Sequence, residues 1–280
     1  MLTLKQYTDV SSFKNEVSNY LEQFEVENNL LLGILSSLKE TDTPIFMATV
    51  IKDVQIVMVM LQTHPNQIIL SHHTIEEVDE IKKLAEELTR AYPKIPGLIG
   101  EAGLTKKLAN DVANLSGSIS KVKMNQRIYR LNRLEKNLTE NGVLMQAAKE
   151  HYPIIKEWVY GFAAEVDMKL TQEEAEKRAI EFIEKGRLYV WIVKGKMVSM
   201  AAATRPTKTN ITINLVYTPK EERKKGHASN CVLALTTKML NQGYYSTSLY
   251  TDLENPTSNK IYMEIGYKPI MDSVVVHFNQ

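Results

Sequence analysis

Hydrophobic residues recur at steps of three and four between residues 8 and 38, which predicts a helix with one buried face. The positions on that face are Val10, Phe13, Val17, Tyr20 and Phe24. Two β-branched runs follow, residues 45–51 and 54–61, and the polar pair Lys52-Asp53 separates them. This pattern predicts a β-hairpin, and residues 67–70 predict a third strand.

Two further helices are predicted from their start signals. Thr74 and Glu77 have the spacing of a capping box, and the apolar stripe of the helix after them contains Ile81 and Leu88. Thr171 and Glu174 form a second box, and the helix after them ends at Gly186. An apolar helical pattern is also present over residues 143–162.

The second half of the chain repeats the order of the first. Strands 188–193 and 197–203 flank Lys194-Gly195 just as the earlier hairpin flanks Lys52-Asp53, and the two turns lie 142 residues apart (194 − 52). A β-branched strand and a helix follow in both halves, and a last strand, 273–278, is expected to close the second sheet. We predict an α/β protein of two related modules, residues 1–135 and 141–280. Chance agreement between two common hairpins is the alternative.

Composition excludes several classes of protein. A hydrophobic fraction of 44% is too high for a disordered chain, and 34 Lys+Arg against 33 Asp+Glu argue against nucleic-acid binding over the whole surface. The one cysteine, Cys231, allows no disulfide within the chain and no zinc site built on cysteines. Apolar runs fall short of a membrane span, so we expect a cytoplasmic protein without membrane or nucleic-acid partners and without a metal.

The segment between strand 211–217 and the next helix is the most informative. It contains four basic residues, Lys220, Arg223, Lys224 and Lys225, and then Gly226. Glycine lets the backbone bend tightly and approach a ligand closely. The amides at a helix start carry partial positive charge, which suits a phosphate. The segment therefore predicts a cradle for phosphate or pyrophosphate, with a solvated basic loop as the alternative.

Two motifs in sequence resemble those of a known family. Arg223-x-x-Gly226-x-Ala228 lies between a strand and a helix, and Asn255, Asn259, Tyr262 and Gly266-Tyr267 follow it. Over about residues 143–280 this order resembles the GNAT family of acetyl-CoA-dependent N-acetyltransferases. The first half looks like a diverged GNAT-like copy, in which an acidic segment, residues 71–77, replaces the loop. Because acidic groups repel a pyrophosphate, this copy is expected to bind no CoA.

The resemblance implies a role for each residue of the later module. Loop amides would bind the CoA pyrophosphate, and these belong to Arg223, Lys224, Lys225, Gly226, His227, Ala228 and Ser229. The strand before them would bind the pantetheine arm through Leu215, Val216, Tyr217 and Thr218, with the Val216 amide polarising the thioester carbonyl. Asn255 and Asn259 would contact the cosubstrate from the opposite wall. Tyr262, a phenol protonated at neutral pH, would protonate the departing thiolate.

The implied reaction is acetyl transfer from acetyl-CoA to a primary amine by direct attack, without an acyl-enzyme. A non-catalytic acyl-CoA sensor or scaffold is the alternative, and a nucleic-acid binder that uses the basic loop is a third reading. The sequence does not identify the acceptor or the oligomeric state. Acceptor-binding residues are expected within 143–170 and 204–210. Glu165, Asp167 and Glu222 are candidates for the general base, and Cys231 is expected in the core.

Overall fold

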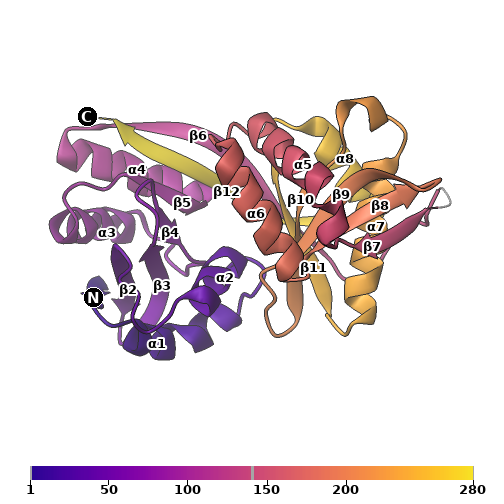
Figure 1. Ribbon diagram of the computed structural model, residues 1–280. Coiled ribbons are helices and arrows are strands. Elements are labelled where there is room, and N and C mark those ends of the chain that lie inside the picture. The colour runs from indigo at the N-terminus through magenta and orange to yellow at the C-terminus, as the bar shows by residue number, and fades with distance from the viewer. Residues whose placement is uncertain (1, 140–141, 280) are drawn as a thin grey trace. The chain divides into compact units, whose positions relative to one another are not determined.

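The structure is a computed structural model that describes residues 2–139 and 142–279 (Figure 1). The chain forms two compact units. Unit 1 comprises the residues up to Tyr129, Tyr250–Pro256 and the residues from Pro269, and unit 2 comprises Arg130–Leu249 and Thr257–Lys268. In each unit, helices flank a mixed and mostly antiparallel sheet, which confirms the predicted α/β class.

Unit 1 takes most of its elements from the first half of the chain. In chain order they are β1 (Leu2–Gln6), α1 (Val10–Glu22), α2 (Asn29–Ser37), β2 (Phe46–Lys52), β3 (Gln55–Gln62), β4 (Ile68–Leu70), α3 (Val78–Ala91), β5 (Gly97–Glu101), α4 (Ala102–Ser116), β6 (Ile119–Leu131) and β12 (Lys268–Asn279). The strands have the order β1-β2-β3-β4-β5-β12-β6. Strands β4 and β5 are parallel, whereas β12 runs antiparallel to β5.

The sheet of unit 1 is buried on both faces. Because successive strand residues point to opposite faces, Ala48 and Met60 pack in the core beneath α3 and α4, whereas Met47 and Leu61 pack against α1 and α2. The larger core also contains Val274 and Val276 of β12. The last strand of the chain is therefore part of the core of unit 1.

The predicted last strand, 273–278, is confirmed within β12. Its neighbour β5 belongs to unit 1, with Ser273 opposite Glu101 and His277 opposite Gly97. The sequence predicted a strand that closes the second sheet, and its pairing with β5 of unit 1 was not predicted. The division into residues 1–135 and 141–280 stays a prediction, since the compact units are not continuous in sequence.

Unit 2 contains the candidate site. Its elements are β7 (Val143–Gln146), α5 (Tyr152–Glu165), α6 (Gln172–Glu184), β8 (Leu188–Val193), β9 (Lys196–Thr204), β10 (Asn210–Tyr217), α7 (His227–Asn241), β11 (Ser246–Asp252) and α8 (Pro256–Ile265), with short 3₁₀ turns at Lys149–His151 and Lys220–Glu222. The strand order is β11-β10-β9-β8-β7. Strands β10 and β11 are parallel and the remaining pairs are antiparallel.

Helices pack on the sheet of unit 2 as its strand alternation dictates. Met200 and Ala202 of β9 join the core formed with α5 and α6. Ser199, which precedes Met200 and therefore points to the other face, lies close enough to Cys231 of α7 for a hydrogen bond. The sheet therefore separates the α5–α6 layer from α7, and α7 follows directly after the basic loop (Figure 1).

Two of the predicted local features are confirmed and one is wrong. The Thr171 box forms, because the Glu174 amide donates to Thr171 Oγ1 at 3.2 Å and the Thr171 amide donates to the Glu174 carboxylate at 2.8 Å. The predicted hairpin forms as β2 and β3. The Thr74 box does not form: α3 begins only at Val78, and the Thr74 amide donates to the Val57 carbonyl at 3.2 Å.

The helical patterns of residues 8–38 and 143–162 are each broken. The first forms α1 and α2, and Asn28 lies between them, donating from Nδ2 to the Leu21 carbonyl at 3.0 Å. Residues Val143–Gln146 of the second form β7, which pairs with β8, before α5 begins at Tyr152. Four residues are too few for a pattern to distinguish a strand from a helix.

Candidate functional site

A β-bulge interrupts strand β10 near its C-terminal end. Asn214 lies opposite Ala202 and Tyr217 lies opposite Met200, so one extra residue is inserted between these pairs. Leu215 has a φ of +48°, which is uncommon for a residue with a side chain. Holding a non-glycine residue there costs about 1–3 kcal/mol. A bulge leaves its extra residue outside the ladder, so the Leu215–Val216 backbone can bind something other than β9.

Strands β10 and β11 pair only over their first residues. The register runs from Asn210 opposite Ser246 to Thr212 opposite Ser248 and extends no further in the described structure. Buried side chains hold this paired end together: Asn210 Nδ2 donates to Ser246 Oγ at 2.8 Å, and the Thr212 and Ser248 hydroxyls are 3.0 Å apart. The backbone of residues 213–217 therefore has an edge that β11 does not use.

Tyr217 is fixed at the end of this edge. Its carbonyl accepts a hydrogen bond from Ser199 Oγ at 3.0 Å, and its ring lies 6.2 Å from that of Trp158. A Cβ on Gly161 would lie only 2.5 Å from the Tyr217 hydroxyl, so α5 approaches the ring closely because residue 161 is glycine. The strand end is thus held between α5 and β9.

Arg223 braces the loop after β10. Its Nε donates to the Thr218 carbonyl at 2.8 Å, its guanidinium forms an ion pair with Glu165 of α5, and its Cζ lies 5.8 Å from the Tyr217 ring centre. The planar guanidinium serves all three contacts at once. Arg223 therefore fixes the loop to the end of β10 and to α5.

Glu222 engages a second cation of the loop. Its carboxylate accepts from Lys196 and, at 2.8 Å, from Lys225, and His227 Nε2 lies 3.7 Å away. The hydrogen bonds from Lys196 and Lys225 lower the pKa of Glu222 to about 2. Two of the four predicted basic residues, Arg223 and Lys225, thus have carboxylate partners. The predicted anion cradle would therefore depend more on main-chain amides than the formal charges suggested.

The backbone around Gly226 has the geometry of an anion site. Lys224 and Gly226 have φ values of +61° and +84°, on either side of Lys225. Alternating hands along a loop turn successive amides toward one point, a concavity that binds anions. A Cβ on Gly226 would meet its nearest atom, Asn230 Nδ2, at 3.7 Å, so the positive φ rather than lack of space requires glycine.

Helix α7 begins directly after this bend. The first helical hydrogen bond runs from the Asn230 amide to the Gly226 carbonyl, at 3.0 Å. The amides of Ala228 and Ser229 precede it and have no such intrahelical acceptor. Ser229 Oγ is buried with no hydrogen-bond partner among the described residues. A buried unpaired hydroxyl at a helix start fits a site that binds an anion.

Tyr262 lies on the buried face of α8. Burial raises its pKa, and Ser258 one turn earlier is within hydrogen-bonding range. Its ring is 6.1 Å from that of Tyr267, whose hydroxyl contacts Thr236 and Thr247 at 2.8 Å each. Tyr262 also lies near Cys231 of α7. This tyrosine therefore faces the first half of α7 and stays protonated at neutral pH.

The structure brings most of the predicted residues into unit 2. Strand β10 and the loop supply Leu215, Val216, Tyr217, Thr218, Arg223, Lys224, Lys225, Gly226, His227, Ala228 and Ser229, and α8 supplies Asn259 and Tyr262. Asn255 precedes α8 and belongs to unit 1, where its amide donates to the Asp252 carbonyl at 3.1 Å. The ligand-binding roles of all these residues remain predictions.

Four other sequence-based candidates are placed by the structure. Burial raises the pKa of Cys231 to about 12, so the thiol is a core group, as predicted. Glu165 and Glu222 hold cations of the loop, which gives each a structural role. Asp167 has a φ of +52° just after α5. Within residues 2–139 and 142–279, no cluster of three or more His, Cys, Asp or Glu residues is arranged to hold a metal.

Unit 1 has different chemistry at the corresponding point. Strand β4 pairs with β3 without a register shift, so no bulge forms there among the described residues. Helix α3 has Glu77 at its N-cap and Asp79 and Glu80 in its first turn. Carboxylates at a helix start occupy the position that favours an anionic ligand. The acidic character that the sequence predicted for this helix start is therefore present.

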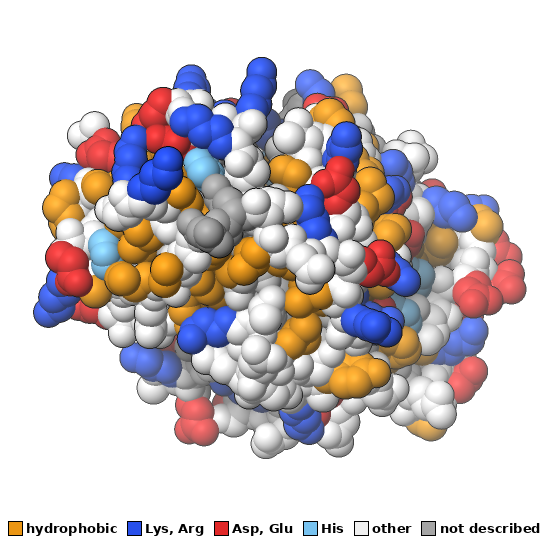
Figure 2. Space-filling model, turned by 90° about the vertical axis from the view of Figure 1, so that its right-hand side faces the viewer, with side chains coloured by type: hydrophobic (Ala, Val, Ile, Leu, Met, Phe, Trp, Pro, Cys, Tyr) orange, Lys and Arg blue, Asp and Glu red, His pale blue; other side chains and the backbone are white. Residues whose placement is uncertain are grey.

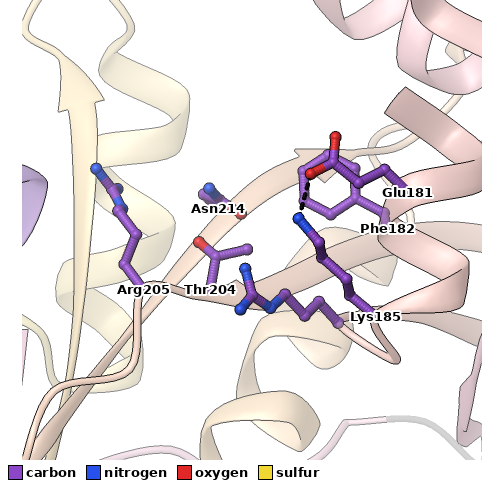
Figure 3. A pocket seen from close by; sticks show the side chains of 7 residues that line it. Glu181, Phe182, Lys185, Thr204, Arg205 and Asn214 are labelled. Carbon is purple, nitrogen blue, oxygen red and sulfur yellow. Dashed lines mark hydrogen bonds and ion pairs between the residues drawn. The ribbon is translucent and has the colours of Figure 1, made fainter. Parts of the chain in front are cut away.

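A cavity of about 330 Å³ lies beside the bulge in unit 2. Helix α6 contributes Glu181, Phe182 and Lys185; β9 and the residue after it contribute Thr204 and Arg205; Asn214 of β10 and Arg187 complete the lining. In Figure 3 the side chains from α6 face Thr204 and Asn214, and Arg205 stands on their other side. Thr204 and Arg205 fall within the range where acceptor contacts were expected, whereas no sequence signal marked the others.

Charge on the surface is mixed. Figure 2 shows one face of the molecule, on which Lys and Arg side chains lie among Asp, Glu and hydrophobic groups rather than in one continuous basic surface. This agrees with the formal net charge of +1. Among the helices of the described ranges, none has the length and apolar character needed to cross a membrane.

Comparisons with known proteins agree with the geometry. Residues 189–276 match the model of a family described as FR47-like protein. A GNAT-family acetyltransferase from Colwellia psychrerythraea is similar in structure, with a TM-score of 0.62 at 14% identity over 99% of this chain and 100% of that one. A GCN5-related N-acetyltransferase from Sphaerobacter thermophilus has a TM-score of 0.62 at 11% identity, over 98% and 94%. Comparison with curated proteins finds no match.

A tandem GNAT protein from the clavulanic acid biosynthesis pathway has a TM-score of 0.57 at 12% identity, over 100% of this chain and 98% of that protein. At such identities the likeness shows the fold. Because the matched structures span both halves of the chain, the resemblance of the later half to GNAT proteins and of the earlier half to a diverged copy is confirmed. The chain therefore has the tandem GNAT fold, and its residues 189–276 match the FR47-like family.

Proposed function

We propose that this protein is an N-acetyltransferase that transfers the acetyl group of acetyl-CoA to a primary amine. The observation that carries the proposal is the combination of three features in unit 2: the bulge at Leu215, the early end of β10–β11 pairing, and the left-handed bend at Gly226. Together they offer an unpaired strand edge that leads to an anion cradle. A pantetheine arm with a diphosphate at its end needs both.

The donor substrate fits the residues present. Amides of residues 224–229 would bind the diphosphate, and the buried Ser229 hydroxyl has no other partner among the described residues. The backbone of Val216 and Tyr217 would hydrogen-bond the pantetheine arm. An amide released from the ladder by the bulge, that of Val216, would stabilise the oxyanion that forms on the thioester carbonyl.

Acetyl transfer then follows by direct attack. The amine nitrogen bonds to the thioester carbonyl carbon, the carbon–sulfur bond breaks, and the sulfur leaves with the electron pair. Tyr262 gives its proton to that sulfur, and the attacking nitrogen loses a proton to a base or to water. Because burial raises the pKa of Tyr262, the acid is in its protonated form throughout the neutral range.

A steady-state assay of CoA release with a panel of amines tests the proposal. We expect turnover by the wild type, and a loss of kcat of about 100-fold or more in Tyr262→Phe because the general acid is removed. Tyr267→Phe is the matched control. It removes a buried phenol that bonds Thr236 and Thr247, so it should lower stability and leave kcat nearly unchanged.

The same assay separates the enzyme from its main alternative. Tight CoA binding without turnover of any amine would favour a sensor or scaffold and would contradict the proposal. Equal kcat for the wild type and Tyr262→Phe would remove Tyr262 from the mechanism. In this account unit 1 supports the working module and binds no CoA, since its corresponding helix start is acidic. A cytoplasmic setting remains part of the proposal.

A further inference from the structure

We propose that the cavity beside the β10 bulge binds the acceptor, and that the acceptor is a small primary amine that also carries an anionic group, a carboxylate or a phosphate. This inference rests on the proposed acetyl transfer and deepens it. It is carried by the position of the cavity, by two polar atoms in its wall, Asn214 Oδ1 and Thr204 Oγ1, that have no hydrogen-bond partner in the described structure, and by the charge of its lining (Figure 3).

The cavity lies next to the point where transfer would occur. Asn214, in its wall, directly precedes Leu215 and Val216, the residues of the bulge. The donor's acetyl group would lie at this bulge if the Val216 amide polarises its carbonyl. A molecule in the cavity would therefore lie beside the acetyl group, and its amine needs to extend only as far as the next residue of the strand.

Two polar atoms in the wall are available to hydrogen-bond a ligand. Asn214 Oδ1 and Thr204 Oγ1 are buried and have no hydrogen-bond partner among the described residues. Thr204 is only 5% exposed, so its hydroxyl cannot rely on bulk solvent. Buried polar groups in proteins are nearly always paired, and exceptions mark sites with a function. The Asn214 oxygen accepts hydrogen bonds, and an amine N–H is a matching donor.

The charge of the wall selects the rest of the acceptor. Three cationic side chains, Lys185, Arg187 and Arg205, face one carboxylate, Glu181, which gives a formal charge of +2 (3 − 1). Glu181 is paired with Lys185, and Arg187 and Arg205 bring two guanidinium groups to the same wall. Guanidinium groups match carboxylates and phosphates in geometry. The same charge disfavours polyamines and other acceptors that carry additional positive charge.

Size limits the acceptor to a small molecule. The cavity holds about 330 Å³, at the lower end of the range for small-molecule sites. An amine at the Asn214 end and an anion near the arginines would fill it. Asn214 would thus bind the amine and the two arginines would bind the anion of one molecule, an amino acid or an amino phosphate.

Matched amines test this inference. In the CoA-release assay we would compare β-alanine with propylamine, and O-phosphoethanolamine with ethanolamine, so that each pair differs in its anionic group. Putrescine supplies a dicationic acceptor. We expect kcat/KM for at least one anionic amine to exceed that of its neutral partner by about tenfold or more, and putrescine to be the poorest acceptor. A higher kcat/KM for β-alanine would indicate a carboxylate acceptor, and a higher kcat/KM for O-phosphoethanolamine would indicate a phosphate acceptor.

Charge variants assign the preference to the cavity. The double variant Arg187→Gln/Arg205→Gln should lower the anionic-to-neutral ratio of kcat/KM by about tenfold, mainly through KM. Glu181→Gln removes the carboxylate and should raise the ratio. The control is Lys177→Gln, which removes a cation from the same helix at a side chain that is 72% exposed and outside the lining. Its ratio should match that of the wild type.

Calorimetry separates this inference from the proposed function. β-Alanine and O-phosphoethanolamine are titrated into protein already loaded with CoA. Transfer to neutral amines at least as fast as to anionic ones would overturn the inference and leave the acetyltransferase in place. Absence of all turnover, together with calorimetric binding of an anionic amine that the double variant loses, would overturn the proposed function and support the anion site. If no anionic amine binds and no preference for anionic amines is measured, the proposed acceptor site is overturned.

Discussion

Glu222 is the residue on which the geometry of the basic loop depends most directly. It joins Lys196 of β9 to Lys225 of the loop, and His227 at the start of α7 lies beside it. The sequence suggested four free cations around a phosphate. Two of them hold carboxylates, so the side chains shape the loop and the amides are left for a ligand.

The pKa of Glu222 predicts a pH-dependent contribution to stability. Its value falls from 4.5 to about 2 in the folded protein, so its contribution is present above pH 4.5 and is lost as the pH falls toward 2. We expect Glu222→Gln to be less stable than the wild type at pH 7, and the difference to vanish by about pH 2. Urea unfolding at a series of pH values measures this difference.

Glu173→Gln is the control for that series. It removes a carboxylate from an ion pair in which Lys177 and Glu173 are 72% and 75% exposed. Exposed pairs contribute little to stability, so its effect should be small at every pH. A difference between wild type and Glu222→Gln that does not change between pH 7 and pH 2 would contradict the assignment.

Some residues carried no signal that a sequence alone reveals. Leu215 has a positive φ, yet leucine is not a residue that marks such a backbone, so the bulge was not predicted. Glycine does signal such a backbone, and the tight bend at Gly226 was predicted because the residue is glycine. The cavity lining was missed because Phe182, Arg187 and Asn214 come from different elements and meet only in the folded unit.

At the scale of elements, start signals were informative where nothing competed with them. Thr171 caps α6 as predicted. Thr74 does not cap α3, because its backbone is bonded to Val57 of β3 and the helix begins one turn later. The pairing of the chain with a neighbouring strand therefore overrode the local signal.

A pair of variants measures that difference. Thr171→Ala should lower the free energy of unfolding by about 1 kcal/mol, the usual contribution of a helix N-cap. Thr74→Ala should change it by less than about 0.5 kcal/mol, because the exposed side chain caps no helix. Chemical denaturation followed by circular dichroism gives both values. Equal losses in the two variants would show that Thr74 has a structural role that this account lacks.

Long β-branched runs around a polar turn were predicted well, and short or weakly patterned elements were not. The hairpin of β2 and β3 was found from two β-branched runs around a polar turn. Strand β7 has four residues and was merged with the helix after it. Strand β5 and helix α4 were not predicted, since Gly97 and Gly100 weaken the strand pattern and nothing marks their junction.

At the scale of the whole molecule, the chain's last strand belongs to unit 1. Strand β12 pairs with β5 and buries Val274 and Val276, which are 0% and 2% exposed. Arg127 of β6 also holds Asp272 of β12 through two hydrogen bonds, one of them 2.9 Å long. The repeat in the sequence predicted two modules, but the pairing of distant strands has no local signature.

This arrangement predicts how fragments of the chain behave. A protein of residues 1–135 lacks β12 and should not fold cooperatively, because burial of each valine contributes about 2 kcal/mol and β5 loses its neighbour. Joining residues 268–280 to that fragment through a flexible linker should restore a cooperative transition. Thermal unfolding followed by circular dichroism measures both. A cooperative transition of equal midpoint without β12 would contradict the pairing.

Binding of the donor at the Gly226 bend is the claim on which the proposed function depends most, and calorimetric titration of acetyl-CoA tests it most directly. Wild type, Gly226→Glu and Gly195→Glu are compared, because both glycines have positive φ, +84° and +75°, and a side chain is strained at either position. Gly195 lies in the β8–β9 turn, outside the site. We expect Gly195→Glu to bind like the wild type and Gly226→Glu, with its native circular dichroism spectrum, to lose at least about 100-fold, or about 2.7 kcal/mol. Micromolar affinity retained in Gly226→Glu would contradict the account.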